Sequence, residues 1–150
     1  MTPGPGERTS DAARVERGFR EALDRFPRSP KLLARLGKCF AVQGRVEEAL
    51  ECVLLSLEMD PGQPGLLLRA GDLFASVERF EEALRFYEHY QELRPRSPRG
   101  YARMGDCLFR QGYFWSAADA FSFALSRSPD SGWIRDRLEG VMRLCAAAEA

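Results

Sequence analysis

Landmark residues in this chain recur at a spacing of 34 residues. A shift of one period from Gly71, Ala83 and Pro95 reaches Gly37, Ala49 and Pro61 in one direction and Gly105, Ala117 and Pro129 in the other. Three copies therefore agree at all three marks. Self-similarity at a fixed period is typical of repeat architectures, in which each copy buries its apolar face against its neighbours. The sequence predicts a stacked array of repeats.

Each copy contains two segments with the apolar spacing of an amphipathic helix. In the central copy these positions are Leu67, Ala70 and Phe74 in the first segment and Ala83, Tyr87 and Tyr90 in the second. A spacing of three or four residues places them on one face of each helix. The first copy opens with Ser29 and Pro30, a helix cap followed by the residue favoured at the first helical position.

The turn between the two helices differs among the copies. Gly44 and Gly112 stand at matching positions of the first and third copies. Glycine readily takes the left-handed conformation that ends a helix. The matching residue of the second copy is Glu78, so we expect that turn to be tighter or slightly strained.

The order of large, small, aromatic and proline positions resembles the tetratricopeptide-repeat family. In the second copy the pattern reads Leu67, Ala70, Gly71, Phe74, Ala83, Tyr87, Tyr90 and Pro95. The resemblance implies an all-α fold, a right-handed α-α superhelix of about eight helices. As a signal for function it is weak, because unrelated processes use the same scaffold.

The repeat boundaries suggest how the chain is divided. We expect a disordered start over 1–9, a half-repeat helix over 10–28 capped by Ser10 and Asp11, three repeats over 29–130 and a capping helix over 131–147. The repeats themselves are 30–63, 64–97 and 98–131. Glu139 stands where glycine is expected in a fourth repeat, and a terminal cap with a polar outer face fits that change.

Composition narrows the class of partner. The 22 basic and 22 acidic residues cancel, which argues against binding to nucleic acid or a membrane surface through bulk charge. The sequence shows no secretory signal and no apolar run long enough to span a membrane. We expect a cytoplasmic protein. Its four cysteines form no C-x-x-C pair, and Cys39 and Cys107, at matching positions two repeats apart, should be too distant for a disulfide. Reduced, buried thiols are therefore expected.

No pattern in the chain indicates catalysis. A serine or cysteine nucleophile needs a base beside it, usually histidine, and the single histidine, His89, is expected on the surface. Phosphate-binding loops, zinc spacings and calcium loops are absent from the sequence. We therefore predict a protein that is not an enzyme and has no cofactor or metal.

The resemblance implies that the first helix of every repeat lines a concave, peptide-binding face. The expected binding residues are Lys31, Arg35, Lys38, Leu68, Arg69, Asp72, Arg99, Arg103, Asp106 and Phe109. One column at the repeat period holds Arg35, Arg69 and Arg103, and Arg137 continues it as a cationic ladder that should prefer carboxylates. Alternatively, Arg69 with Asp72 and Arg103 with Asp106 are pairs within one helix that only solubilise the surface.

The expected function is that of a non-enzymatic adaptor that binds a protein or peptide of acidic character. One branch of the family grips chaperone tails with basic and asparagine side chains. Arg99 and Arg103 match its basic pair, but the chain contains no asparagine, which argues against that partner.

Two other functions remain open at this point. The chain also resembles small chaperones of type III translocator subunits, which bind an apolar extended segment; Leu68, Ala102 and Phe109 would then matter most. The third possibility is that the chain is a regulatory subunit of an enzyme and has no chemistry of its own.

Self-association through the convex side is a further possibility. Leu54 and Leu55 stand where the family usually carries polar residues, and Phe123 belongs to the same side of the third repeat. An exposed apolar patch of this kind often marks an interface. The alternative is that these leucines pack against the N-terminal helix.

Overall fold

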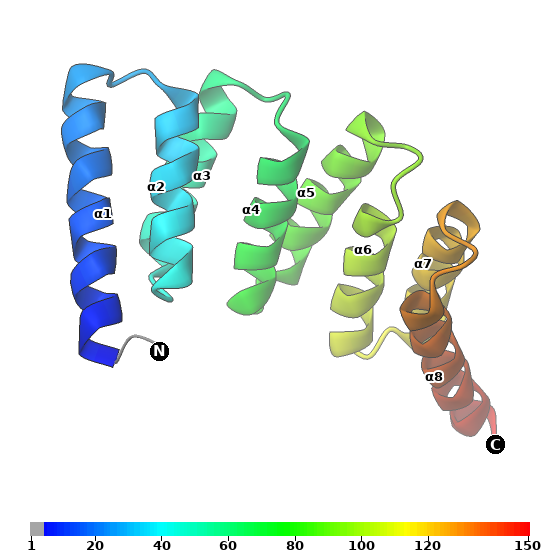
Figure 1. Ribbon diagram of the computed structural model, residues 1–150. Helices are drawn as coiled ribbons and strands as arrows, with labels where there is room; N and C mark the ends of the chain where they lie inside the picture. Colours follow the sequence, from blue (N-terminus) through cyan, green and yellow to red (C-terminus); the bar gives the residue numbers. More distant parts are fainter. Residues whose placement is uncertain (1–4) are drawn as a thin grey trace. The chain divides into compact units, whose positions relative to one another are not determined.

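A computed structural model describes residues 5–150, with side chains from residue 11 onward. Over this range the chain forms eight α-helices and no strand (Figure 1). Their bounds are α1 Pro5–Arg25, α2 Pro30–Val42, α3 Val46–Met59, α4 Pro64–Ser76, α5 Phe80–Leu93, α6 Arg99–Arg110, α7 Phe114–Arg127 and α8 Gly132–Glu149. The predicted all-α architecture of about eight helices is confirmed.

The N-terminal helix starts earlier than we expected. It begins at Pro5, not near Ser10, so Ser10 and Asp11 lie inside the helix and do not cap it. Asp11 instead accepts a hydrogen bond from Arg14 at 2.9 Å. Proline is favoured at a first helical position because its missing N–H would be unpaired there anyway. Of the predicted disordered start, residues 1–4 lie outside the described part.

The helices divide into two compact units, one up to residue 66 and one over 67–150. In the first unit α2 packs on α3 and α1 packs on α2. Ser29 caps α2 as predicted, because its Oγ accepts a hydrogen bond from the backbone N–H of Leu32 at 3.3 Å and Pro30 follows it. Ser56 ties the two helices further by donating to the carbonyl of Pro30 at 2.7 Å.

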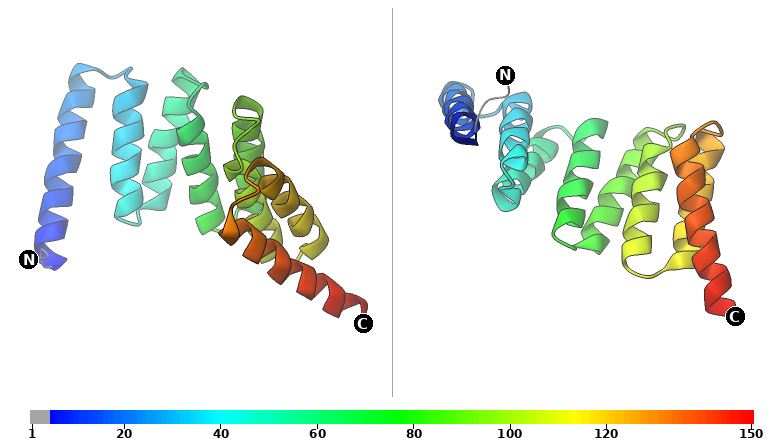
Figure 2. Two further views of the ribbon diagram at one scale, coloured as in Figure 1. Left: turned by 45° about the vertical axis from the view of Figure 1, so that its right-hand side comes forward. Right: turned by 60° about the horizontal axis from the view of Figure 1, so that its bottom comes forward.

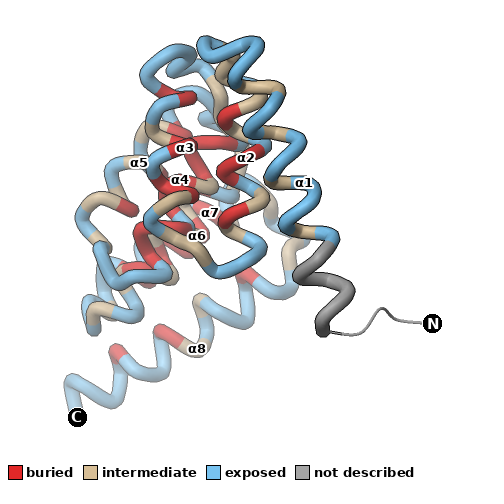
Figure 3. The backbone as a smooth tube through the Cα atoms, turned by 90° about the vertical axis from the view of Figure 1, so that its left-hand side faces the viewer, coloured by how far each residue is buried: buried red, intermediate tan, exposed pale blue. Residues whose placement is uncertain are grey.

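The second unit builds its core from helices whose backbones approach closely. A Cβ atom added at Gly105 of α6 would lie 2.8 Å from ring carbons of Phe121 on α7. Beyond α7, α8 completes the core with Ile134, Val141 and Cys145, each at most 3% exposed. Figure 2 shows α8, coloured orange to red, alongside α7. In Figure 3 the few buried positions of α8 stand among exposed ones.

The three turns between paired helices share one backbone conformation. Gly44 and Gly112 have φ angles of 74° and 84°, and Glu78 has a φ of 61°. The left-handed conformation costs a residue with a Cβ roughly 1–2 kcal/mol. The strain expected at the second turn therefore lies at Glu78.

Replacing Glu78 with Gly is expected to raise the free energy of unfolding by about 0.5–1 kcal/mol. The gain from relieved backbone strain is about 1–2 kcal/mol, and the extra freedom of glycine in the unfolded chain offsets about 0.4–1 kcal/mol of it. Urea unfolding followed by circular dichroism measures the change. Glu81→Gly, inside α5, is the control and should lower stability; a loss of stability in Glu78→Gly would contradict the assignment.

Candidate functional site

The ten predicted binding residues fall into two groups, one in each unit. Lys31, Arg35 and Lys38 lie on α2 in the first unit, and all three are exposed. The remaining seven lie on α4 and α6 in the second unit.

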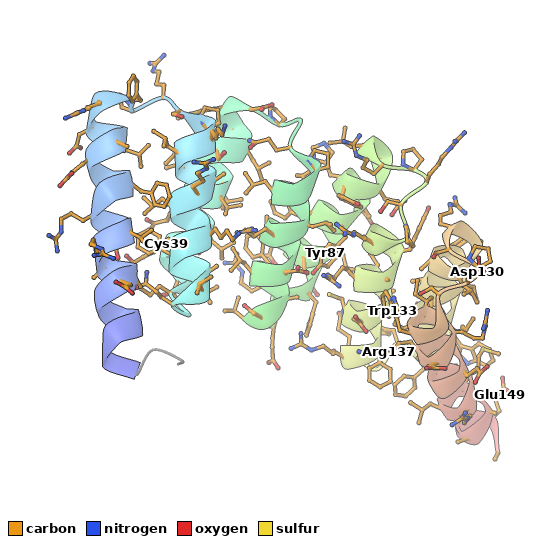
Figure 4. All side chains as sticks on the ribbon, viewed as in Figure 1. Cys39, Tyr87, Asp130, Trp133, Arg137 and Glu149 are labelled. Atoms are coloured by element: carbon orange, nitrogen blue, oxygen red, sulfur yellow. The ribbon has the colours of Figure 1, made fainter. Side chains whose placement is uncertain are left out.

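Two interhelical ion pairs define the face of the second unit. Nε of Arg103 lies 2.9 Å from Oδ1 of Asp72, joining α6 to α4. Nη1 of Arg137 lies 2.7 Å from Oδ1 of Asp106, joining α8 to α6 (Figure 4). Each arginine thus meets the aspartate 31 positions before it.

These contacts correct both earlier expectations for the arginine column. Within residues 67–150 the pairs Arg69–Asp72 and Arg103–Asp106 are not formed, because each aspartate here meets the arginine of the following first helix. The column is also not a free cationic ladder, since Arg103 and Arg137 each hold a carboxylate. A surface ion pair is worth only about 0–1 kcal/mol, so these pairs orient side chains more than they stabilise the fold.

Tyr87 fixes the carboxylate of Asp72 from a second side. Its hydroxyl donates a hydrogen bond to Oδ1 of Asp72 at 2.6 Å, and the residue is 1% exposed (Figure 4). Burial, followed by the hydrogen bond to Asp72, raises the pKa of Tyr87 well above its usual value. The phenol therefore stays protonated, and its hydrogen bond holds the Asp72 carboxylate next to Arg103.

Burial also shifts the pKa values of two groups at the second ion pair, Asp106 and Cys107. It raises the pKa of Asp106 even though the charges of Arg137, Arg103 and Arg110 act in the opposite direction. Burial likewise raises the pKa of the Cys107 thiol to about 11. The thiol is thus protonated at neutral pH and is a poor nucleophile.

Two cavities open on this face. The first, of about 410 Å³, is lined by Asp72, Ala75, Ser76, Tyr87, Arg103, Asp106, Cys107, Phe109, Arg110 and Arg137. The second, of about 430 Å³, is lined by Phe109, Phe121, Asp136, Arg137, Gly140, Val141, Arg143 and Leu144. Phe109 and Arg137 belong to both, so the two cavities adjoin.

The other predicted residues of this unit differ in accessibility. Arg99 is exposed and Arg69 is partly exposed, and neither makes an ion pair within residues 67–150. Phe109 is 36% exposed and packs its ring against Phe114, with centroids 5.7 Å apart. Leu68 is only 8% exposed, so its side chain belongs to the core and offers little surface to a ligand.

The first unit has a cavity of its own between α1 and α2. It measures about 470 Å³, and Arg35 and Lys38 stand beside the apolar residues Val15, Phe19 and Val42 in its lining. Lys31 does not line it. Two of the three predicted basic residues of α2 therefore share one hollow.

Leu54 and Leu55, predicted to mediate self-association, differ in exposure. Leu54 is partly buried and Leu55 is 46% exposed. Phe123 is 53% exposed, yet its ring packs on Tyr101 with centroids 5.4 Å apart. Self-association through Leu54 and Leu55 stays a prediction.

Sequence reasoning missed two parts of the site. The first part is the contact of Tyr87 with Asp72. The same repeat position holds Val53, Tyr87 and Phe121, and of these three side chains only the tyrosine has a hydroxyl that indicates a polar partner. The cavity against α8 had a fainter signal, the placement of Arg137 in the arginine column. Leu144 and Gly140 carried none.

The described residues offer no sign of a metal centre or a membrane span. Among residues 11–150 no three His, Cys, Asp or Glu side chains are grouped as metal ligands. None of the helices in the described part is both long and apolar enough to cross a membrane.

Comparisons with known proteins identify the architecture. A family model described as tetratricopeptide repeat matches residues 9–64. A crystal structure of MamA is 18% identical, with a TM-score of 0.85 over 97% of this chain and 86% of that one. The first tetratricopeptide domain of Spaghetti (RPAP3), bound to the HSP90 peptide SRMEEVD, is 20% identical, with a TM-score of 0.72 over 78% and 93%.

A third structure and a sequence search complete the comparison. The Sgt2 tetratricopeptide domain from Aspergillus fumigatus is 17% identical, with a TM-score of 0.72 over 80% of this chain and 81% of that one. A search of curated protein sequences gives no match. At these identities the structural likeness establishes the fold alone.

Proposed function

Since the chain belongs to the tetratricopeptide-repeat family, we propose that it is a non-enzymatic adaptor that binds a peptide segment of another protein. The binding face is the one that α4, α6 and α8 form in the second unit. The observation that carries the proposal is the pair of adjoining cavities that share Phe109 and Arg137. Binding sites are typically concave and combine apolar walls with a few convergent polar groups.

The charge of this face favours a segment of acidic character. Arg69, Arg99, Arg103 and Arg137 stand against Asp72 and Asp106, which leaves an excess positive charge of two. Arg69 and Arg99 have donors that no carboxylate within the unit occupies. The peptide SRMEEVD held by the RPAP3 domain has three acidic residues and one basic residue, which supports an acidic ligand on this scaffold.

The alternative is a chaperone that holds an apolar extended segment, as in type III secretion. The apolar lining of the cavity against α8 favours it. Of the three apolar contacts that this reading needs, however, Leu68 and Ala102 are 8% and 1% exposed, which leaves only Phe109. The acidic adaptor is therefore the better supported function, and we place it in the cytoplasm.

Salt dependence separates the two functions. Affinity capture from lysate, followed by mass spectrometry, identifies the partner, and fluorescence anisotropy with the captured segment measures affinity at about 0.05 M and 0.5 M NaCl. Ionic capture weakens as the screening length shortens, so we expect affinity to fall at least about tenfold. Unchanged or tighter binding at high salt would favour the apolar chaperone.

A further inference from the structure

We infer that α8 is part of the binding site and supplies the pocket for an apolar anchor of the bound segment. The inference rests on the proposed function and names the ligand more closely. The segment carries one large apolar side chain, Leu, Met or Phe, within a residue or two of a carboxylate. The apolar side chain enters the cavity between α6 and α8, and Arg137 binds the carboxylate.

The cavity has the construction of an apolar side-chain pocket. Two of its lining residues, Phe121 and Val141, belong to the core, are 0% and 3% exposed and offer a ligand little surface. Phe109 and Leu144 form the walls and are 36% and 41% exposed. Gly140 has no side chain, and no atom lies within 4 Å of where its Cβ would be. The opening is therefore kept clear by the absence of a single side chain.

The rim of the cavity supplies the charge that selects the occupant. Arg137 uses Nη1 to hold Asp106 at 2.7 Å, which orients the guanidinium and leaves most of its five donors for a ligand. Arg143 is 81% exposed at its side chain and lies 3.9 Å from Glu139, too far for a hydrogen bond. The cavity lining itself carries two arginines and one carboxylate, Asp136, and each arginine also has a carboxylate beside it, Asp106 or Glu139. The arginine donors that these carboxylates leave free are complementary to an acidic residue beside the apolar anchor.

Packing of α8 onto the fold does not account for these features. The residues that bury α8 in the core are Ile134, Val141 and Cys145. Leu144 and Gly140 are outside that cluster of buried residues. Met142 provides a comparison on the same helix, because it is 46% exposed but does not line the cavity.

The test uses three fluorescein-labelled nonapeptides and the full chain. The first peptide is acidic with a central Leu-Phe pair, the second has Ala-Ala at the centre, and the third replaces every acidic residue of the first with its amide. Anisotropy should show the first binding at least about tenfold more tightly than the second, since burying a Leu or Phe side chain contributes about 1.5–3 kcal/mol. The first should also bind more tightly than the third, because the amides remove the carboxylate that Arg137 binds. Equal binding of the first two peptides would overturn the anchor pocket.

Matched variants locate the binding. Leu144→Glu should lower affinity for the first peptide at least about tenfold, whereas Met142→Glu should leave it within about twofold. Gly140→Leu fills the opening from within the helix and should reduce affinity without harming the fold, which circular dichroism checks. If Leu144→Glu and Gly140→Leu both bind as the wild type does, the inference is wrong.

The same variants distinguish this inference from the proposed function. Loss of binding on charge reversal at Arg69 and Arg99, with wild-type binding by Leu144→Glu, would remove the α8 pocket and keep the peptide-binding face. If all these variants bind the first peptide as the wild type does, both the α8 pocket and the proposed peptide-binding face are wrong. Failure of the wild-type chain to bind the first peptide at all would overturn the anchor pocket.

Discussion

Replacing Gly71 with Ala is expected to lower the free energy of unfolding by about 3 kcal/mol. The added Cβ would lie 2.7 Å from Cδ1 of the Tyr87 ring and 2.8 Å from its Cζ. The ring cannot retreat easily, because it is 1% exposed and its hydroxyl is tied to Asp72. Overpacking of a well-filled core typically costs 1–3 kcal/mol, and this site is at the upper end. Chemical unfolding followed by circular dichroism measures it.

Gly140→Ala is the matched control for that substitution. The site is in the interior of α8 and has no atom near the added Cβ, so the same change should raise stability by about 1 kcal/mol through helix propensity. If Gly→Ala lowers the free energy of unfolding at position 71 and raises it at position 140, the loss at Gly71 comes from the close approach of α4 and α5. The helix propensity of glycine would not explain it. A Gly71→Ala chain as stable as the wild type would contradict the packing of α4 on α5.

Reversing the charge of Arg69 and Arg99 together is expected to weaken binding of the acidic Leu-Phe peptide about 30-fold at low salt. Each change replaces an attraction with a repulsion, and two such changes in partly screened sites combine to about that factor. The effect should shrink at high salt. Anisotropy titrations at two salt concentrations measure both.

The variant keeps Arg103 unchanged. A glutamate at 103 would face Asp72 across the contact that Arg103 now makes at 2.9 Å, so lost binding could reflect a disturbed fold. Arg85→Glu with Arg96→Glu is the control, because these arginines are exposed, lie outside α4, α6 and α8, and carry the same total change of charge. Equal loss in both double variants would attribute binding to net charge and contradict the proposed face.

The repeat period made most of the fold predictable. A residue such as Gly44, Pro30 or Ser29 acts on its own backbone, so its role can be worked out from local chemistry. The start of α1 could not be placed in this way, because a proline at the first helical position and a serine cap further along are both acceptable beginnings. The structure begins that helix at Pro5.

The proposed binding face was less predictable because its contacts join different helices. Within one helix Asp106 is three residues from Arg103, but across helices it meets Arg137, 31 residues away. Which of these pairs forms depends on how far neighbouring first helices are offset along their axes. That offset cannot be predicted from the spacing of residues within a single helix. Leu68 shows the same limit, since its burial depends on packing partners outside its own helix.

An NMR titration with the acidic Leu-Phe peptide tests the central claim most directly. We expect the largest amide shift changes at Arg69, Arg99, Phe109, Arg137 and Leu144, with an apparent affinity that falls as salt rises. Shift changes confined to the outer surfaces of α5 and α7, or an affinity insensitive to salt, would contradict the account.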